Sequence, residues 1–94
     1  MIRHIVLFSA RDADDVPRIK AALERMAAIA GATCFEVSLN AKRDRLSTEI
    51  DIVLYSEFAS WADLDAYQAH PLYQEVTQIV RPLRDQRIVV DTEG

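Results

Sequence analysis

The order of its apolar runs is the feature that most constrains what this chain can fold into. Short runs rich in β-branched residues, typical of strands, alternate with apolar residues at helical spacing. The order is strand, helix, strand, strand, helix, strand, and the predicted strands cover residues 2–8, 34–39, 50–58 and 87–92. The 94 residues suffice for one domain, so residues 1–94 must build a single core.

Two segments show helix signals. The first follows the acidic residues 14–15, which we expect to cap it, and carries Pro17 in its first turn. The second opens with Ser60-Trp61-Ala62-Asp63, a pattern typical of a capping box. His70 precedes Pro71, and a residue before proline avoids helical geometry, so the second helix is predicted to break there and restart at Pro71.

This order predicts an α+β fold of the ferredoxin-like βαββαβ type, with a four-stranded antiparallel sheet and helices on one face. The helices can cover only one face, yet the strands are apolar on both: Val6 and Phe8 alternate with Ile5 and Leu7. We therefore expect a homodimer in which two sheets meet face to face and form an α/β barrel. We expect Val6 and Phe8 to lie in that sheet-to-sheet interface.

Composition excludes several classes of protein. A hydrophobic fraction of 50% with 28% charged residues is typical of a globular domain, and the net charge of −4 argues against binding to nucleic acid or anionic membranes. The single cysteine, Cys34, excludes an internal disulfide and a cysteine-cluster metal site. No segment has the roughly 18 consecutive apolar residues of a membrane span, and no signal peptide is evident, which predicts a cytoplasmic protein.

Four stretches resemble one known family: residues 1–8 (MIRHIVLF), 51–58 (DIVLYSEF), 64–71 (LDAYQAHP) and 87–91 (RIVVD). In the same order along the chain, they are similar to stretches of the stress-responsive A/B barrel (Dabb) family of the dimeric α/β-barrel superfamily. The resemblance implies a ferredoxin-like subunit that dimerises through its sheet. Relatives of this kind include stress-induced, heat-stable proteins and a polyketide cyclase that closes an aromatic ring by aldol chemistry, so the fold alone does not select an activity.

His4 and Tyr67 are the candidate catalytic residues. An imidazole in an apolar cavity is suited to act as a general acid or base, because its reference pKa of about 6.5 is easily tuned. The alternative is a core histidine that is hydrogen-bonded within the fold. The resemblance favours the functional interpretation, since cyclase-type members use a histidine at the position of His4 and place a tyrosine matching Tyr67 in the pocket.

The stretch His70-Pro71-Leu72-Tyr73 departs from the family pattern His-Pro-x-His. The second histidine of that pattern, which is the catalytic one in the cyclase, is replaced here by Tyr73. Tyrosine, with a reference pKa near 10, is a poor base at neutral pH. The replacement therefore predicts negligible ring-closing activity. For His70 the simpler expectation is a polar cap on the helix that begins at Pro71.

Two classes of function remain open. In the first, a stable dimer binds a small apolar or aromatic molecule in the barrel interior. In the second, a cofactor-independent enzyme, polyketide-cyclase-like or a small monooxygenase, uses His4 as its acid or base. No cofactor motif is present, and the two histidines come from different elements with no third ligand, so we expect no metal site. The predicted ligand pocket consists of His4, Val6, Leu54, Tyr67, His70 and Tyr73.

Overall fold

Four antiparallel strands form one sheet in the order β2-β3-β1-β4. The computed structural model describes residues 1–94. Its elements are β1 (Ile2–Ala10), α1 (Val16–Glu24), β2 (Ala32–Leu39), β3 (Ile52–Phe58), α2 (Trp61–Ala69), α3 (Pro71–Val80) and β4 (Arg84–Glu93), with short 3₁₀ turns at Ala13–Asp15 and Arg25–Ala28. The predicted ferredoxin-like α+β fold is confirmed.

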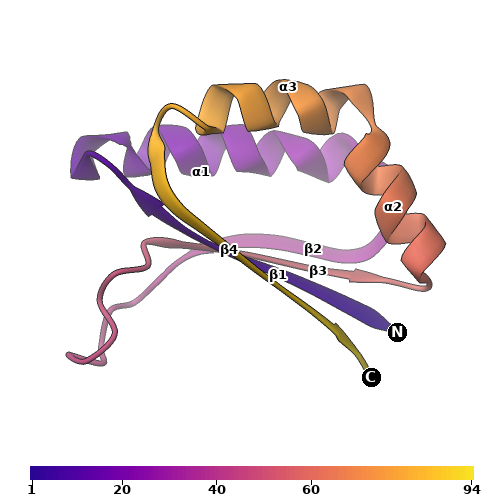
Figure 1. Ribbon diagram of the computed structural model, residues 1–94, viewed down its shortest axis with the longest axis horizontal. Helices are drawn as coiled ribbons and strands as arrows, with labels where there is room; N and C mark the ends of the chain where they lie inside the picture. The colour runs from indigo at the N-terminus through magenta and orange to yellow at the C-terminus, as the bar shows by residue number, and fades with distance from the viewer.

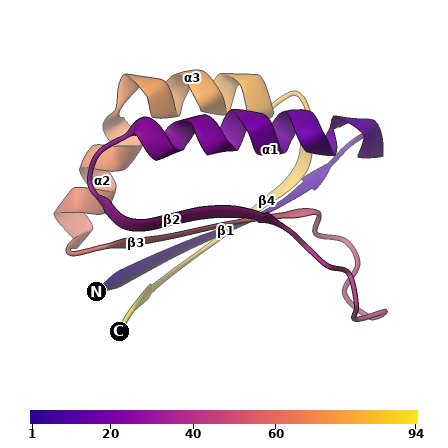
Figure 2. The same cartoon turned by 180° about the vertical axis from the view of Figure 1, so that it is seen from behind.

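The helices form a single layer over one face of the sheet. Figures 1 and 2 show α1 and α3 side by side above the strands, with α2 at one end, and no helix on the opposite face. The two ends of the chain meet at the edge of the sheet, where the Met1 amino group donates to the Gly94 carbonyl at 3.0 Å. No helix is long and apolar enough to cross a membrane.

Several element boundaries differ from the sequence prediction: β1 ends at Ala10 rather than at residue 8, and β2 begins at Ala32 rather than at residue 34. Asp12, rather than the acidic pair 14–15, provides the N-terminal cap, accepting a hydrogen bond from the Asp14 amide at 2.9 Å at the start of the 3₁₀ turn. The third strand begins at Ile52, two residues late, and the fourth begins at Arg84, three residues early. In α2 the Ser60 half of the expected capping box is present, since Ser60 Oγ accepts from the Asp63 amide at 3.2 Å.

The expectation that Val6 and Phe8 lie between two sheets is wrong. Both are buried within their own subunit, 2% and 4% exposed, in the core that the sheet forms with the helices. The helices cover this face with apolar side chains at helical spacing: Ile19, Ala22, Leu23, Met26, Leu64, Tyr67, Val76 and Val80. Alternation along β1 therefore places Ile5 and Leu7 on the uncovered face.

The uncovered face carries a continuous apolar patch. The strand register aligns Ile5 of β1 with Tyr55 and Val90, and Leu7 with Val53 and Ile88. We call these six residues the open face: Ile5, Leu7, Val53, Tyr55, Ile88 and Val90. Ile88 and Val90, at the edge, are 45% and 43% exposed.

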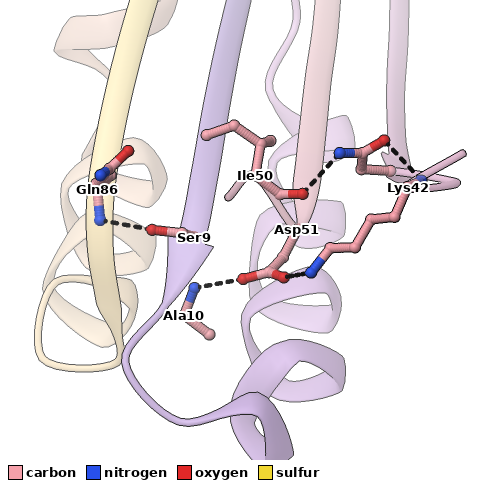
Figure 3. A network of polar contacts seen from close by, with 7 residues as sticks. Ser9, Ala10, Lys42, Ile50, Asp51 and Gln86 are labelled. Carbon is pink, nitrogen blue, oxygen red and sulfur yellow. Dashed lines mark hydrogen bonds and ion pairs between the residues drawn. The ribbon is translucent and has the colours of Figure 1, made fainter. Parts of the chain in front are cut away.

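The segment between β2 and β3 is held to the end of β1 by polar contacts (Figure 3). Asp51 Oδ2 accepts from the Ala10 amide at 2.8 Å, and its other oxygen pairs with Lys42 Nζ at 2.5 Å. Burial acts to raise the pKa of Asp51, but the hydrogen bonds from Lys42 and Ala10 outweigh it and lower that pKa below its usual value. Asn40 donates to the Ile50 carbonyl at 2.7 Å, so the segment is fixed at both of its ends.

Candidate functional site

A cavity lies between the sheet and the helices, inside one subunit. Seven of its lining side chains are aliphatic, aromatic or thioether groups of the core: Val6, Phe8, Leu23, Met26, Leu54, Val76 and Val80. The remaining six carry polar atoms: His4, Tyr67, Tyr73, Thr77, Arg84 and Arg87. The space open to the centre of a water molecule is about 20 Å³, which is room for about one water.

His4 forms the inner end of this cavity and is held by a carboxylate. It lies in the central strand, 1% exposed, with Asp91 as its direct partner on β4 and Ser56 as its partner on β3. Asp91 Oδ1 is 2.6 Å from His4 Nδ1, and the Ser56 hydroxyl donates to the His4 carbonyl at 3.2 Å. The carboxylate therefore favours the tautomer with the proton on Nδ1, and Nε2 remains without a partner in the chain.

Aromatic rings connect His4 to the outer wall of the cavity. The Tyr67 ring lies edge-on to His4, with centroids 6.5 Å apart, and edge-on to Tyr73 at 5.4 Å. Such edge-to-face arrangements are favourable because a positive ring edge meets a negative ring face. Arg87 Nη2 donates to the Tyr73 hydroxyl at 3.1 Å, so this series of rings ends in a guanidinium.

The Tyr67 hydroxyl is buried and poorly solvated. Its one hydrogen bond goes to Met26 Sδ at 3.8 Å, a weak acceptor. Burial, with a smaller contribution from Tyr73, raises the pKa of Tyr67 well above its ordinary value. The group therefore stays protonated at neutral pH, where it can donate a hydrogen bond but cannot remove a proton.

Five of the six residues predicted for the pocket line this cavity, and His70 does not. His4, Val6, Leu54, Tyr67 and Tyr73 come together from two strands and two helices of one subunit rather than across two subunits. His70 is exposed and accepts from the Leu72 amide through Nδ1 at 3.0 Å. It thus caps α3, which is the simpler of its two sequence interpretations.

Sequence reasoning missed Asp91, Arg84 and Arg87. Asp91 had a signal: the first and last strands of a βαββαβ sheet are neighbours, so a polar residue on β4 could face His4. Arg87 had the same signal, since it shares a face with Asp91 in the regular part of β4, whereas the direction of Arg84 depends on an irregularity in that strand. No group of three or more His, Cys, Asp or Glu side chains lies close enough together to hold a metal ion.

The fold and the cavity together define a class of protein: a ferredoxin-like domain with a buried histidine between sheet and helices. The family model of the stress responsive A/B barrel domain matches residues 2–93, and the chain belongs to that family. No curated protein matches the chain in sequence.

Solved structures show the same fold. A dimeric ferredoxin-like protein of unknown function from Bacteroides fragilis is 31% identical, with a TM-score of 0.80, and the match covers 99% of this chain and 95% of that one. A Dabb family protein from Mesorhizobium loti is 22% identical, with a TM-score of 0.85 over 99% and 95% of the two chains. A structure described as an antibiotic biosynthesis monooxygenase is 12% identical, with a TM-score of 0.79 over 100% and 98%, and shares the fold alone.

Proposed function

We propose that this protein is a homodimer in which each subunit binds a small apolar or aromatic molecule in the cavity between its sheet and its helices. The observation that carries the proposal is the position of His4, a fully buried polar side chain at the inner end of a cavity whose lining is mainly apolar and aromatic. Ligand sites commonly combine an apolar lining with a few convergent polar groups. Tyr67 and Tyr73 supply the other polar groups near His4.

Ligand entry requires the outer wall to move. The cavity of about 20 Å³ is far smaller than the few hundred Å³ typical of small-molecule sites. Tyr73 and Thr77 of α3 are only half-buried, as is Arg84 of β4, and with the exposed Arg87 they form the wall that lies nearest solvent. Binding is therefore expected to displace α3 outward from the sheet.

The open face accounts for the dimer. Apolar side chains at the centre of a sheet are normally covered, and in this subunit no helix covers them. Two open faces in contact give a two-fold symmetric interface, as expected for a homodimer. The Bacteroides fragilis relative, described as dimeric, supports this arrangement.

Thermal unfolding and methyl NMR with a panel of aromatic acids and short 1,3-diketones test the binding proposal. A ligand at about 100 times its Kd adds about 2.7 kcal/mol to the free energy of unfolding, a shift of several degrees in Tm. His4→Ala and Tyr67→Phe should weaken binding while the fold is retained. His70→Ala and Tyr55→Phe make the same chemical changes outside the cavity and should leave binding unchanged. No shift of Tm and no change at Val76 or Val80 methyl groups would contradict the proposal.

The pairing of His4 with Asp91 favours a second candidate function, cofactor-independent acid–base catalysis. A carboxylate on Nδ1 leaves Nε2 free to accept a proton from an acidic carbon of a bound carbonyl compound. The protonated Tyr67 hydroxyl can donate to the oxygen that becomes negative. Deuterium exchange at the acidic carbon of a bound diketone, followed in wild type and His4→Gln, tests this function.

A further inference from the structure

The β4 strand contains an extra residue beside the cavity, and it changes the direction of an arginine. Phe8 pairs with Arg87 and Ala10 with Arg84, so three steps along β4 correspond to two steps along β1. Side chains three apart in a regular strand point to opposite faces, whereas one inserted residue brings them to the same face. Both Arg84 and Arg87 accordingly line the cavity.

A buried hydroxyl fixes this bulge. The Gln86 amide, within the irregular stretch, donates to Ser9 Oγ at 3.0 Å, and Ser9 is 6% exposed (Figure 3). β-Bulges occur often beside functional sites, where they redirect a side chain. Here the effect of the bulge is to turn Arg84 toward the cavity.

The two arginines belong to a cationic cluster without carboxylate partners. Arg81 and Arg11 lie near them, and burial together with the charges of Arg87, Arg81 and Arg11 lowers the pKa of Arg84. None of the four takes part in any ion pair of the chain. The Arg11 side chain donates only to the Arg84 carbonyl, at 3.0 Å, and the Arg87 side chain only to the Tyr73 hydroxyl.

Four like charges at one edge of a chain with net charge −4 repel one another, and an anion between them would relieve that repulsion. We propose that Arg84 and Arg87 bind the oxyanion, a carboxylate or a phosphate, of the ligand whose apolar part enters the cavity. The proposal rests on the proposed function and specifies its ligand class. Guanidinium groups suit this role because their planar donors match both oxyanions.

The strand register determines which end of the cavity the anionic group of such a ligand occupies. Arg87 and Asp91 are four residues apart on β4, which is about 13 Å along a strand. Asp91 is the partner of His4, so the arginines and the imidazole occupy opposite ends of the cavity. The anionic group therefore lies at the outer end, and the uncharged part of the ligand reaches Tyr67 and His4.

Matched probes that differ only in the head group test the proposal. One series is phenylacetate, phenylacetamide and benzylphosphonate, and the other is heptanoate, heptanamide and hexylphosphonate. Titration of the wild-type protein, followed by methyl NMR, should give at least about tenfold tighter binding of one anion than of its amide. Raising the salt concentration should reduce that preference. The tighter of the two anions identifies the oxyanion.

The double variant Arg84→Gln/Arg87→Gln should lose the preference and bind the amides as the wild type does. Arg45→Gln, an exposed and unpaired arginine in the segment between β2 and β3, is the matched control and should keep the preference. Equal affinity for anion and amide in the wild type overturns this proposal and leaves the binding function standing. So does a preference that persists in the double variant. Absence of binding by all six probes overturns both.

Discussion

His4 on the central strand and Asp91 on the edge strand are direct partners in the β1–β4 register, with Asp91 Oδ1 2.6 Å from His4 Nδ1. The imidazole side chain is 1% exposed, whereas the Asp91 side chain is 34% exposed. A partly hydrated carboxylate can hold a buried imidazole at a lower desolvation cost than a fully buried carboxylate could. The pair therefore fixes the imidazole in the wall of the cavity and leaves Nε2 without a partner in the chain.

Asp91→Ala should lower the free energy of unfolding and remove the preference of His4 for the tautomer with its proton on Nδ1. Loss of the partner leaves a buried Nδ1–H without an acceptor, which costs about 1–3 kcal/mol of unfolding free energy. Urea unfolding measures the loss, and ¹⁵N NMR of the imidazole reports which nitrogen carries the proton. Asp85→Ala, exposed on the same strand and without a partner, is the control and should change neither quantity. An unchanged tautomer in Asp91→Ala would show that the carboxylate does not orient His4.

Phe8→Ala should lower the free energy of unfolding by about 3–5 kcal/mol, because Phe8 is 4% exposed within the core of its own subunit. The expected loss is a property of the subunit, so it should appear at every protein concentration. Measuring urea unfolding across a hundredfold range of concentration tests this. If the loss of unfolding free energy disappears at high protein concentration, Phe8 contributes to the interface between subunits instead.

Leu7→Glu should convert the dimer into a monomer of 10.6 kDa. Leu7 lies at the centre of the open face, where a carboxylate would be buried without a partner between two sheets. Sedimentation velocity at micromolar concentration distinguishes the two states. Leu46→Glu makes the same change at a leucine that is 90% exposed, and it should remain dimeric. A dimeric Leu7→Glu, or a monomeric wild type, contradicts the face-to-face arrangement.

Acid should weaken the protein partly through Asp51. Its pKa in the folded state lies below the usual 3.8, so its contribution to stability is complete above that value and is lost as the pH falls through the folded-state pKa. Between about pH 5 and about pH 3, wild type should lose more unfolding free energy than Asp51→Asn. Asp65→Asn removes an exposed, unpaired carboxylate of α2 and should follow the wild type. Parallel losses in all three proteins would assign the acid sensitivity to other groups.

The order of strands and helices could be predicted from the sequence because the spacing of apolar residues differs between strands and helices, and because capping residues and prolines mark where the helices begin. The face of the sheet that the helices cover could not be predicted from apolar residues alone, since Val6 and Ile5 are equally suited to either side. The usable signal was charge. Arg3 shares a face with Ile5 and lies opposite Glu57 in the strand register, and a row with two charged residues is expected outside the helix-covered core.

The cavity was harder to predict than the fold, because it depends on register. His4, Tyr67 and Tyr73 carry recognisable chemistry, and α2 and α3 bring the two tyrosines over the strand that holds His4. The direction of Arg84 depends on a single inserted residue in β4, which no periodicity reports. His70 also carries recognisable chemistry, but its role in the fold is to accept one hydrogen bond from the Leu72 amide at the start of α3.

The catalytic proposal predicts proton transfer without ring closure. His4 alone can remove a proton from a 1,3-diketone and accelerate its deuterium exchange by about 10²–10⁴-fold, and His4→Gln should abolish that acceleration. Closing an aromatic ring requires a second acid–base group. In the cyclase pattern that the sequence resembles, this group is a histidine at the position of Tyr73, whose hydroxyl here accepts from Arg87 at 3.1 Å. Wild type should therefore give no ring-closed product from linear polyketides.

Tyr73→His should introduce a trace of ring closure, because it adds a second imidazole to the wall of the cavity that His4 lines. The Tyr67 ring lies 6.5 Å from His4 and 5.4 Å from Tyr73, so both imidazoles would be neighbours of Tyr67 in that cavity. Mass spectrometry of the products of wild type, Tyr73→His and Tyr73→His/His4→Ala provides the comparison, with His4→Ala in the double variant removing the first base. Product from wild type contradicts the assigned role of Tyr73, and product from the double variant contradicts that of His4. If none of the three proteins gives a ring-closed product and diketone exchange is not accelerated either, ligand binding remains as the function of the cavity.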